Sequence, residues 1–192
     1  MTAYIIGVDE VGLGAWAGPL YVCAVAVPAS WRPAQKLTDS KEMTPAMREA
    51  VYTNVLQQLP MTIMAVGNEQ IDKMGIRSAL IHAHTLAIQC MLSLYPNAEV
   101  IVDGNVPLPE LPQAKLIPKA DALYPAVSAA SVIAKVNRDL AMKHLHTAYP
   151  HYGFDKNAGY GVPAHQKGLK EHGVTPWHRK SYAPIKKLLE RT

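Results

Sequence analysis

The stretch Tyr4–Val27, YIIGVDEVGLGAWAGPLYVCAVAV, constrains the fold of this chain more than any other. Its two runs rich in Val and Ile, Tyr4–Val8 and Leu20–Val27, predict a pair of neighbouring buried strands. Asp9 and Glu10 follow the first run. Because side chains of a strand alternate between faces, at least one of these carboxylates points toward a covered face, where an unpaired charge is costly. A bound cation removes that cost, and carboxylate oxygens suit Mg²⁺ or Mn²⁺.

The turn between the two runs contains Gly12, Gly14 and Gly18. Glycines allow backbone N–H groups to approach a ligand more closely than residues with side chains do. The turn therefore predicts a ligand site next to the carboxylates. Taken alone, the stretch leaves open a second interpretation, in which the strand simply ends in a charged, solvated turn.

The composition describes one soluble globular domain. The chain has 192 residues, 49% of them hydrophobic and 18% charged, enough for a sizeable core without a disulfide framework. We expect a single domain over residues 1–192, located in the cytoplasm. No apolar run reaches membrane-spanning length, and the N-terminal run has no basic segment before it, so a signal peptide is not expected. Cys23 and Cys90 lie in apolar surroundings and are expected to be free thiols in a reducing compartment.

The positive charge lies entirely in the last part of the chain. Residues 1–150 carry a balance of −1, whereas residues 151–192 carry +5, which gives the net charge of +4. A basic segment beside a carboxylate site favours a polyanionic substrate, with nucleic acid the leading candidate. We therefore expect residues 151–192 to bind substrate, with a merely solvated basic tail as the alternative.

The first half of the chain predicts alternating strands and helices. Thr44 before Pro45 is typical of a helix start, and this helix is expected to continue to about Leu59. Met61–Val66 predicts a third strand. A helical pattern then covers Glu69–Leu94, with a break near Gly75.

The second half repeats the combination of an apolar strand and a terminal carboxylate. The strand Glu99–Val102 leads to Asp103, and a short strand at Leu116–Ile117 leads to Asp121. A long helix with small residues in its first turns is expected over Val127–Ala148. Together these elements predict an α/β protein with a mixed sheet and helices on its faces. Carboxylates at the ends of separate strands then converge at one edge of the sheet, where open α/β sheets bind ligands.

Four carboxylates at element ends suggest phosphodiester hydrolysis. Two divalent ions about 4 Å apart can neutralise the attacked phosphate, supply a nucleophilic water and stabilise the leaving oxygen. The sequence has no zinc pattern, no phosphate-binding Walker loop and no serine nucleophile elbow. Two of the four have simpler alternatives, because Asp103 can cap a turn and Asp121 can stabilise a helix N-terminus.

Six ordered motifs, spread over nearly the whole chain, resemble one known family. They are VDEVGLGAWAGPL at 8–20, DSKEMT at 39–44, IVDGN at 101–105, KADALYPAVSAASVIAKVNRD at 119–139, YGFDKNAGYG at 152–161 and HRKSYAP at 178–184. This set resembles the type 2 ribonuclease H family, the ribonuclease HII proteins. The resemblance implies an RNase H-like fold, a five-stranded mixed sheet flanked by helices. It also implies metal-dependent cleavage of the RNA strand of RNA/DNA hybrids, and incision 5′ of a single ribonucleotide in duplex DNA that leaves 3′-hydroxyl and 5′-phosphate ends.

The resemblance assigns roles to residues by motif position. Asp9, Glu10, Asp103 and Asp121 match the family's catalytic metal ligands, which hold one or two Mg²⁺ or Mn²⁺ ions. The other matching positions imply substrate binding. They are Gly12, Leu13 and Gly14, where the family has Gly-Arg-Gly, and Ser40, Lys41, Tyr160, His178 and Arg179. Contact with the ribose 2′-hydroxyl is what separates RNA from DNA at one nucleotide.

Leu13 is the clear departure from the family pattern, because leucine offers no charged fork to a phosphate. It suggests one rival function, a less selective nuclease on the same fold. A rival of another class is a hybrid-binding module without catalysis. The four carboxylates argue against the second, since binding alone does not require negative charge facing phosphate. We expect a monomer whose partners are these duplexes and not a membrane. No clamp-binding motif is evident after Leu189.

Overall fold

The computed structural model describes residues 3–33, 37, 43–54 and 56–190. The chain forms two compact units whose segments interleave along the sequence. The first unit is made of the residues up to Val11, Tyr21–Met64 and Ile81–Val136. The second unit is made of Gly12–Leu20, Ala65–Leu80 and the residues from Asn137 onward.

A five-stranded mixed sheet organises the fold, as the sequence predicts. Its strands are β1 (Tyr4–Val11), β2 (Leu20–Pro28), β3 (Met61–Val66), β4 (Glu99–Asp103) and β5 (Lys115–Ile117). The spatial order is β3-β2-β1-β4-β5. β1 pairs antiparallel with β2 and parallel with β4, and β4 pairs parallel with β5.

Seven α-helices and three short 3₁₀ helices occur in the described residues. They are α1 (Pro45–Asn54), η1 (Leu56–Gln58), α2 (Asn68–Met74), α3 (Ile76–Leu94), η2 (Ala120–Ala122), α4 (Pro125–Ala148), η3 (Pro150–Tyr152), α5 (Phe154–Asn157), α6 (Pro163–His172) and α7 (Ala183–Leu189). The Thr44 hydroxyl accepts the N–H of Met47 at 3.2 Å, so the predicted start of α1 is confirmed. That helix ends earlier than expected, at Asn54, with the 3₁₀ turn η1 after it. Gly75, at φ 81°, separates α2 from α3 as predicted.

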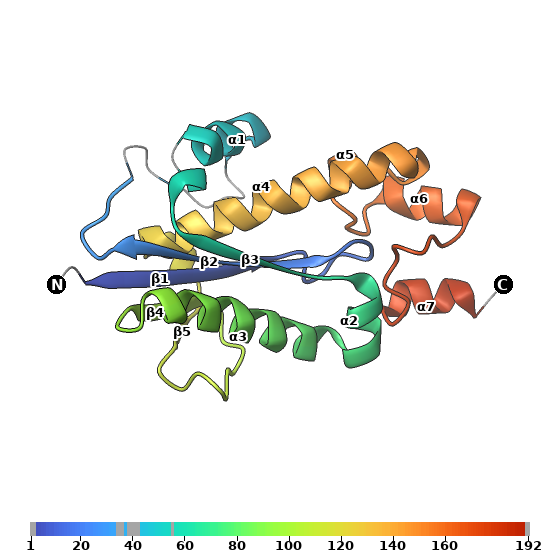
Figure 1. The fold of residues 1–192 in the computed structure, drawn as a ribbon. Helices are drawn as coiled ribbons and strands as arrows, with labels where there is room; N and C mark the ends of the chain where they lie inside the picture. Colours follow the sequence, from blue (N-terminus) through green and yellow to red (C-terminus); the bar gives the residue numbers. More distant parts are fainter. Residues whose placement is uncertain (1–2, 34–36, 38–42, 55, 191–192) are drawn as a thin grey trace. The chain divides into compact units, whose positions relative to one another are not determined.

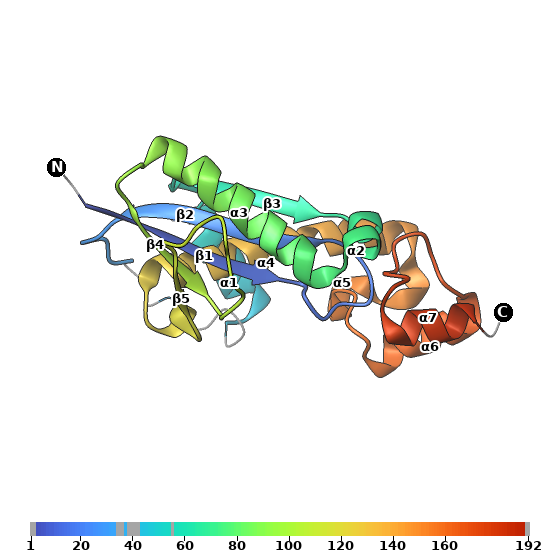
Figure 2. The same cartoon turned by 90° about the horizontal axis from the view of Figure 1, so that it is seen from below.

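Helices cover both faces of the sheet in the first unit. Figures 1 and 2 show α4 on one face, with α1 beyond it, and α3 on the other face. The small residues of α4 allow a close approach to the sheet. A Cβ added at Gly7 of β1 would lie 2.2 Å from the backbone of Ala126, so this strand position faces α4 and has room only for glycine. Ala129, Ala130 and Ile133 continue the contact in a buried cluster that includes strand residues of β2.

Four of the five strands are longer than the sequence pattern predicts, and in two of them, β1 and β4, the extension includes carboxylates. β1 continues through Asp9 and Glu10, because antiparallel pairing with β2 extends to the pair Val11 and Tyr21. β4 likewise includes Asp103. The carboxylates therefore lie within paired strands, where the backbone fixes the face to which each side chain points.

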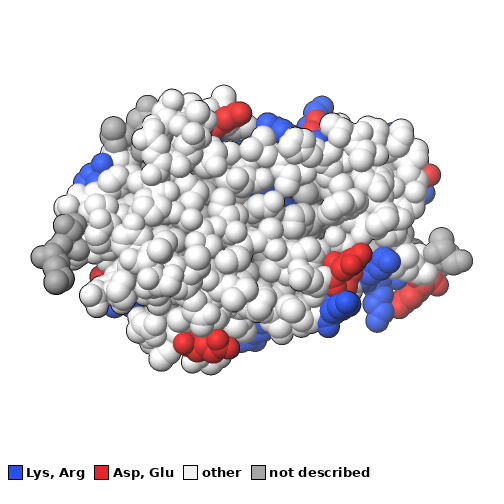
Figure 3. Space-filling model, in the orientation of Figure 1, with Lys and Arg blue, Asp and Glu red and all other residues white. Residues whose placement is uncertain are grey.

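The second unit has its own core. Met142, Tyr152, Phe154, Leu169 and Ile185 are buried together in it. Its surface carries most of the lysines of the C-terminal segment. In Figure 3, charged side chains gather where α2 and α7 lie in Figure 1, and the rest of that face is mainly uncharged. Within the described residues, no helix is both long and apolar enough to cross a membrane.

Candidate active site

Asp9 and Asp103 are neighbours on two parallel strands. Val8 of β1 pairs with Val102 of β4, so the next residue of each strand, Asp9 and Asp103, points to the same face of the sheet. Gly7 shows that this face is the one covered by α4, because side chains two residues apart share a face. The predicted convergence of these two carboxylates therefore follows from strand register alone.

Asp9 is a buried carboxylate whose charged form is destabilised by its surroundings. Its side chain is only 7% exposed. The N–H of Glu10 donates to Oδ1 of Asp9 at 2.7 Å, and the Ser131 hydroxyl of α4 also forms a hydrogen bond with it. These bonds do not compensate for the loss of water. Burial first, and then the charges of Glu10 and Asp103, raise the pKa of Asp9 to about 8.

Glu10 points away from Asp9, as alternation along a strand requires. Its carboxylate oxygen Oε2 lies 3.6 Å from Nε2 of His84. His84 belongs to α3, and its side chain is almost fully buried. Because α3 and α4 cover opposite faces of the sheet, the Asp9 and Glu10 side chains leave β1 toward opposite helices.

Asp103 connects β4 to the segment that carries Asp121. Oδ1 of Asp103 accepts the backbone N–H of Ala120 at 2.7 Å, which fastens η2 to the end of the strand. Asp121 lies in η2, directly after Ala120, and its Oδ1 accepts the N–H of Ala122 at 3.0 Å. Asp121 also lines a hollow of about 360 Å³ together with Arg32, Leu37 and residues 122–125.

The four carboxylates suit a hard divalent ion in chemistry, although they do not form a closed site. Among the described ranges, no three His, Cys, Asp or Glu side chains come close enough to enclose a metal ion. The donors are nonetheless all carboxylate oxygens, the ligand type of Mg²⁺ and Mn²⁺. A cation beside Asp9 would also reverse the burial penalty that now raises its pKa. The donor set therefore fits the metal that the sequence implies.

The turn Gly12-Leu13-Gly14 belongs to the second unit and is held by its backbone. The Leu13 carbonyl accepts hydrogen bonds from Nη1 of Arg179, at 3.0 Å, and from the Tyr182 hydroxyl. The Leu13 side chain is 41% exposed and therefore projects from the turn. Gly12 adopts φ 93°, and a Cβ there would lie 2.2 Å from Nε of Arg138. Both the backbone conformation and the packing require glycine at position 12.

Tyr160 lies beside this turn. Within the described part of the chain, a Cβ added at Gly14 would meet the Tyr160 ring at 3.9 Å and nothing closer. The guanidinium carbon of Arg138 lies 5.6 Å from the centre of the same ring. Tyr160 is 36% exposed, so part of its ring faces solvent. The second unit thus brings Gly12, Gly14 and Tyr160 together, three residues that the resemblance assigns to recognition of the ribonucleotide.

Arg138 supports this group from inside the unit. It is fully buried, and its guanidinium donates to three backbone carbonyls: Pro19 at 2.9 Å, Ala158 at 2.9 Å and Ala17 at 3.3 Å. Two of these carbonyls belong to the segment after the glycine turn, and the third lies two residues before Tyr160. Arg138 therefore links the two loops through their backbones.

Arg179 and His178, which the sequence predicts to bind substrate, do not lie at the surface. Both are fully buried. The Arg179 guanidinium donates to the carbonyls of Gly18 and Leu13 and to the Tyr182 hydroxyl, so it is not available to a phosphate in this structure. Ser40 and Lys41, the other polar positions expected in the groove, lie outside the described residues.

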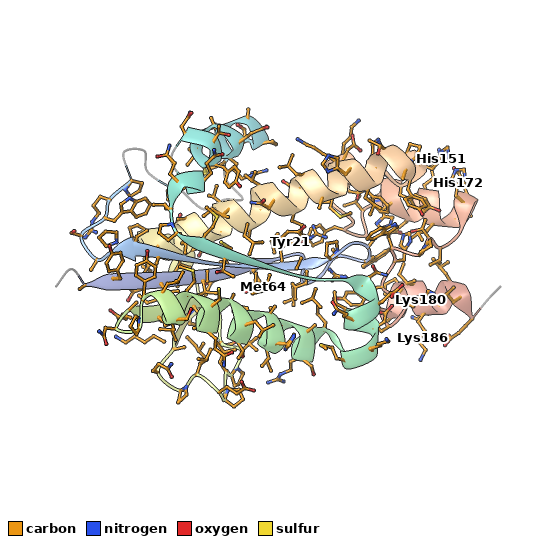
Figure 4. All side chains as sticks on the ribbon, viewed as in Figure 1. Tyr21, Met64, His151, His172, Lys180 and Lys186 are labelled. Atoms are coloured by element: carbon orange, nitrogen blue, oxygen red, sulfur yellow. The ribbon has the colours of Figure 1, made fainter. Side chains whose placement is uncertain are left out.

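Exposed lysines of the C-terminal segment are better placed to meet a polyanion. Lys180, Lys186 and Lys187 are exposed, and Figure 4 shows Lys180 and Lys186 close to α7. Part of this charge is offset locally. Asp72 of α2 accepts the backbone N–H groups of Lys180 and Ser181 at 2.9 and 2.8 Å, and Lys186 lies 4.0 Å from Glu190.

Three residues near the carboxylates and the glycine turn have no signal in the sequence pattern. Ser131 is one of several small residues of α4, His84 lies in an apolar helix, and Arg138 precedes an aspartate within a long helix. Helical spacing shows which face of α4 is buried, but it does not show that a buried serine meets a carboxylate.

Comparisons with known proteins agree with this picture. A family model described as "Ribonuclease HII" matches residues 6–185. A ribonuclease HII of Xylella fastidiosa is 40% identical over 190 residues, which is 98% of this chain and 80% of the relative. The ribonuclease HII in a structure of the PCNA:RNase HII complex from Archaeoglobus fulgidus is 25% identical, with a TM-score of 0.74 over 97% of each chain. A Bst-RNase HIII solved in complex with Mn²⁺ shares the fold, with a TM-score of 0.80 at 20% identity over 99% of this chain and 70% of that one.

Proposed function

This chain belongs to the ribonuclease HII family and is a ribonuclease H, and on this premise we propose its detailed reaction. The enzyme hydrolyses the RNA strand of RNA/DNA hybrids. It also incises duplex DNA on the 5′ side of a single embedded ribonucleotide, leaving 3′-hydroxyl and 5′-phosphate ends. Enzymes of this family depend on divalent metal ions, and we propose one or two Mg²⁺ or Mn²⁺ ions here.

The room left at Gly14 is the observation that carries the proposal of ribonucleotide recognition. Unlike Gly12, Gly14 has no conformational or packing reason to be glycine, because a Cβ there would make only an ordinary contact with Tyr160. Among the residues that the structure describes, only the Tyr160 ring approaches the space above Gly14, and this ring forms one wall of it. A sugar that enters this space meets backbone groups on one side and the Tyr160 ring on the other. Backbone N–H and C=O groups can then bind the 2′-hydroxyl that DNA lacks.

Asp9, Glu10, Asp103 and Asp121 are the residues that would hold the metal ions. Divalent ions held there would supply charge neutralisation at the attacked phosphate and a water of lowered pKa, the chemistry that hydrolysis near neutral pH needs. Contacts from other elements hold three of the four side chains in place. Ser131 orients Asp9, His84 lies against Glu10, and the N–H of Ala120 fixes Asp103.

The remaining proposed contacts to the substrate come from backbone groups and from lysine side chains. Leu13 contributes its backbone, since its carbonyl is fixed by Arg179 and Tyr182 while its side chain cannot bind phosphate. The exposed lysines Lys180 and Lys187 contact the phosphates of the duplex, with Ser40 and Lys41 as further candidates from the sequence. We propose that the enzyme acts as a monomer in the cytoplasm.

One gel tests the proposed function. It compares an all-DNA duplex, a duplex with one ribonucleotide and a full RNA/DNA hybrid, each with Mg²⁺, with Mn²⁺ and with a chelator. We expect cleavage of the second and third substrates only, with either metal and not with the chelator. Cleavage of the all-DNA duplex would favour a less selective nuclease, and binding without cleavage would favour a non-catalytic module.

Leu13→Arg tests the proposal that Leu13 contributes only its backbone to substrate binding. The new guanidinium adds a charge-assisted phosphate contact worth about 1.5–3 kcal/mol if well placed. We expect tighter binding and a higher kcat/KM on both ribonucleotide substrates, with the cut site unchanged. A lower activity on both substrates would mean that the leucine itself contacts substrate.

A further inference from the structure

Two buried histidines of the second unit form a hydrogen-bonded pair next to the Tyr160 loop. His165 belongs to α6, and His178 lies in the segment between α6 and α7. Both side chains are fully buried, and their Nε2 atoms lie 2.9 Å apart. Nothing in the proposed reaction requires a pair of buried histidines, so their role needs another explanation.

The backbone fixes which nitrogen of each ring carries a proton. The N–H of Thr175 donates to Nδ1 of His178 at 2.9 Å, so a neutral His178 carries its proton on Nε2. Nδ1 of His165 lies 3.0 Å from the carbonyl oxygen of Tyr160, which can only accept, so His165 carries its proton on Nδ1. His178 therefore donates from Nε2 to the bare Nε2 of His165. The result is one directed chain of hydrogen bonds from Thr175 through His178 and His165 to Tyr160.

The surroundings of the pair favour two neutral rings. The aromatic rings that face it are those of Trp16, Tyr152 and Phe154, with centroids 5.2–6.2 Å away. None of them carries a charge at neutral pH, and Tyr152 is the only titratable one. Burial lowers the pKa of both histidines, that of His178 to about 4. Both rings therefore stay neutral at neutral pH, each with one proton, and the chain of hydrogen bonds persists.

The chain ends on the residue proposed to read the ribonucleotide. The Tyr160 carbonyl also accepts the N–H of Val162 at 2.8 Å, and the Tyr160 N–H donates to the Asn157 carbonyl at 2.9 Å. Local turn bonds thus set the loop conformation, and the bond from His165 attaches the loop to α6. A loop residue that must stack on a sugar needs such an attachment, because a displacement of about 1 Å can cost roughly 100-fold in rate.

We propose that His165 and His178 are positioning residues that hold Tyr160 in the orientation required to select a ribonucleotide. The proposal rests on the proposed function, since it assumes that Tyr160 contacts the sugar. His165 makes the direct bond to the Tyr160 carbonyl. His178 presents its proton to His165 and thereby sets the tautomer that makes this bond possible.

Two substitutions at His165 separate the two ends of the chain. In His165→Asn the side-chain amide occupies the place of Nδ1, so it can still donate to the Tyr160 carbonyl but cannot reach His178. In His165→Gln the amide occupies the place of Nε2, so it can meet His178 but not the carbonyl. The exposed His144 of α4 provides the matched control, His144→Asn.

The readout is the ratio of kcat/KM on a duplex with one ribonucleotide to kcat/KM on a continuous hybrid. We expect His165→Gln to lower this ratio by roughly tenfold, because the single-ribonucleotide substrate offers only one register for Tyr160. We expect His165→Asn to stay within about threefold of wild type and His144→Asn to match it. Equal ratios in the Asn and Gln variants would overturn the positioning role. A loss of thermal stability that is equal in both variants does not change this test, because the ratio compares two substrates of the same variant.

Nitrogen NMR of the wild-type histidines tests the chain without any variant and without activity. At pH 7 we expect His178 protonated on Nε2 only and His165 on Nδ1 only. The opposite tautomer in either ring overturns the proposal. If the wild type cleaves none of the three duplexes, the proposed function fails, while the tautomers still decide whether the directed chain exists.

Discussion

Gly12 and Gly14 lie in the same turn, and the structure predicts opposite consequences of replacing each with alanine. Gly14 is not among the described residues with positive φ, and its added Cβ meets only the Tyr160 ring at 3.9 Å. Alanine therefore fits the fold. Because alanine restricts the unfolded chain, Gly14→Ala is expected to stabilise the protein by about 0.4–1 kcal/mol, or roughly 1–4 °C in Tm for a chain of this length.

Gly12→Ala has the opposite sign. The residue has φ 93°, and its Cβ would lie 2.2 Å from Nε of Arg138, a side chain held by three carbonyls. The left-handed conformation and the displaced arginine together cost at least about 2 kcal/mol, which lowers Tm by roughly 4–8 °C.

Activity separates a packing role from a ligand role at Gly14. In Gly14→Ala a methyl group occupies the space where the proposed sugar contacts the backbone. We expect kcat/KM on the single-ribonucleotide duplex to fall by about 10–100-fold, equivalent to 1.4–2.8 kcal/mol, as one hydrogen bond is lost and the sugar is displaced. Differential scanning fluorimetry and steady-state cleavage measure the two effects on one preparation. If a stable Gly14→Ala variant cleaves this duplex within twofold of wild type, the space above Gly14 is not the ribonucleotide site.

Three further outcomes are expected. Because His178 has a pKa of about 4 when folded and near 6.5 when unfolded, the unfolded state binds more protons between these values. The free energy of unfolding in urea falls by about 2 kcal/mol from this group between pH 7 and pH 5, and His178→Asn lacks that component. Arg138→Met leaves three carbonyls without their donor and lowers Tm by at least roughly 6 °C, measured by circular dichroism. In log–log plots of duplex affinity against salt, Lys180→Ala lowers the slope by about one, while Arg179→Lys leaves it unchanged because that side chain is buried.

The fold and the carboxylates are predictable because both depend on local periodicity. Apolar runs of Val and Ile define the strands, and alternation along β1 then determines that Asp9 and Glu10 face opposite sides. The register of two parallel strands places Asp103 next to Asp9. The error in strand length has a simple cause, since polar residues continue a strand when a partner strand supplies its hydrogen bonds.

The roles of the long polar side chains are not predictable in this way. Arg179 and His178 belong to a motif next to basic residues, which suggests a surface that meets phosphate. Their burial depends on Gly18, Leu13 and His165, residues 13 to 166 positions away along the chain. Neither spacing nor composition encodes such contacts, so the sequence identifies the right segment and not the direction of its side chains.

The hydrolysis of the full RNA/DNA hybrid by the Asp103→Asn variant tests the role of the carboxylates most directly. Asparagine keeps an oxygen that can accept the Ala120 N–H, so the local structure survives while the negative charge is lost. With saturating Mn²⁺, we expect the rate to fall by at least about 10³ relative to wild type, with the exposed Glu110→Gln as the control that keeps full activity. A folded Asp103→Asn protein that cleaves the hybrid within tenfold of the wild-type rate would contradict the assignment of these carboxylates to metal-dependent catalysis.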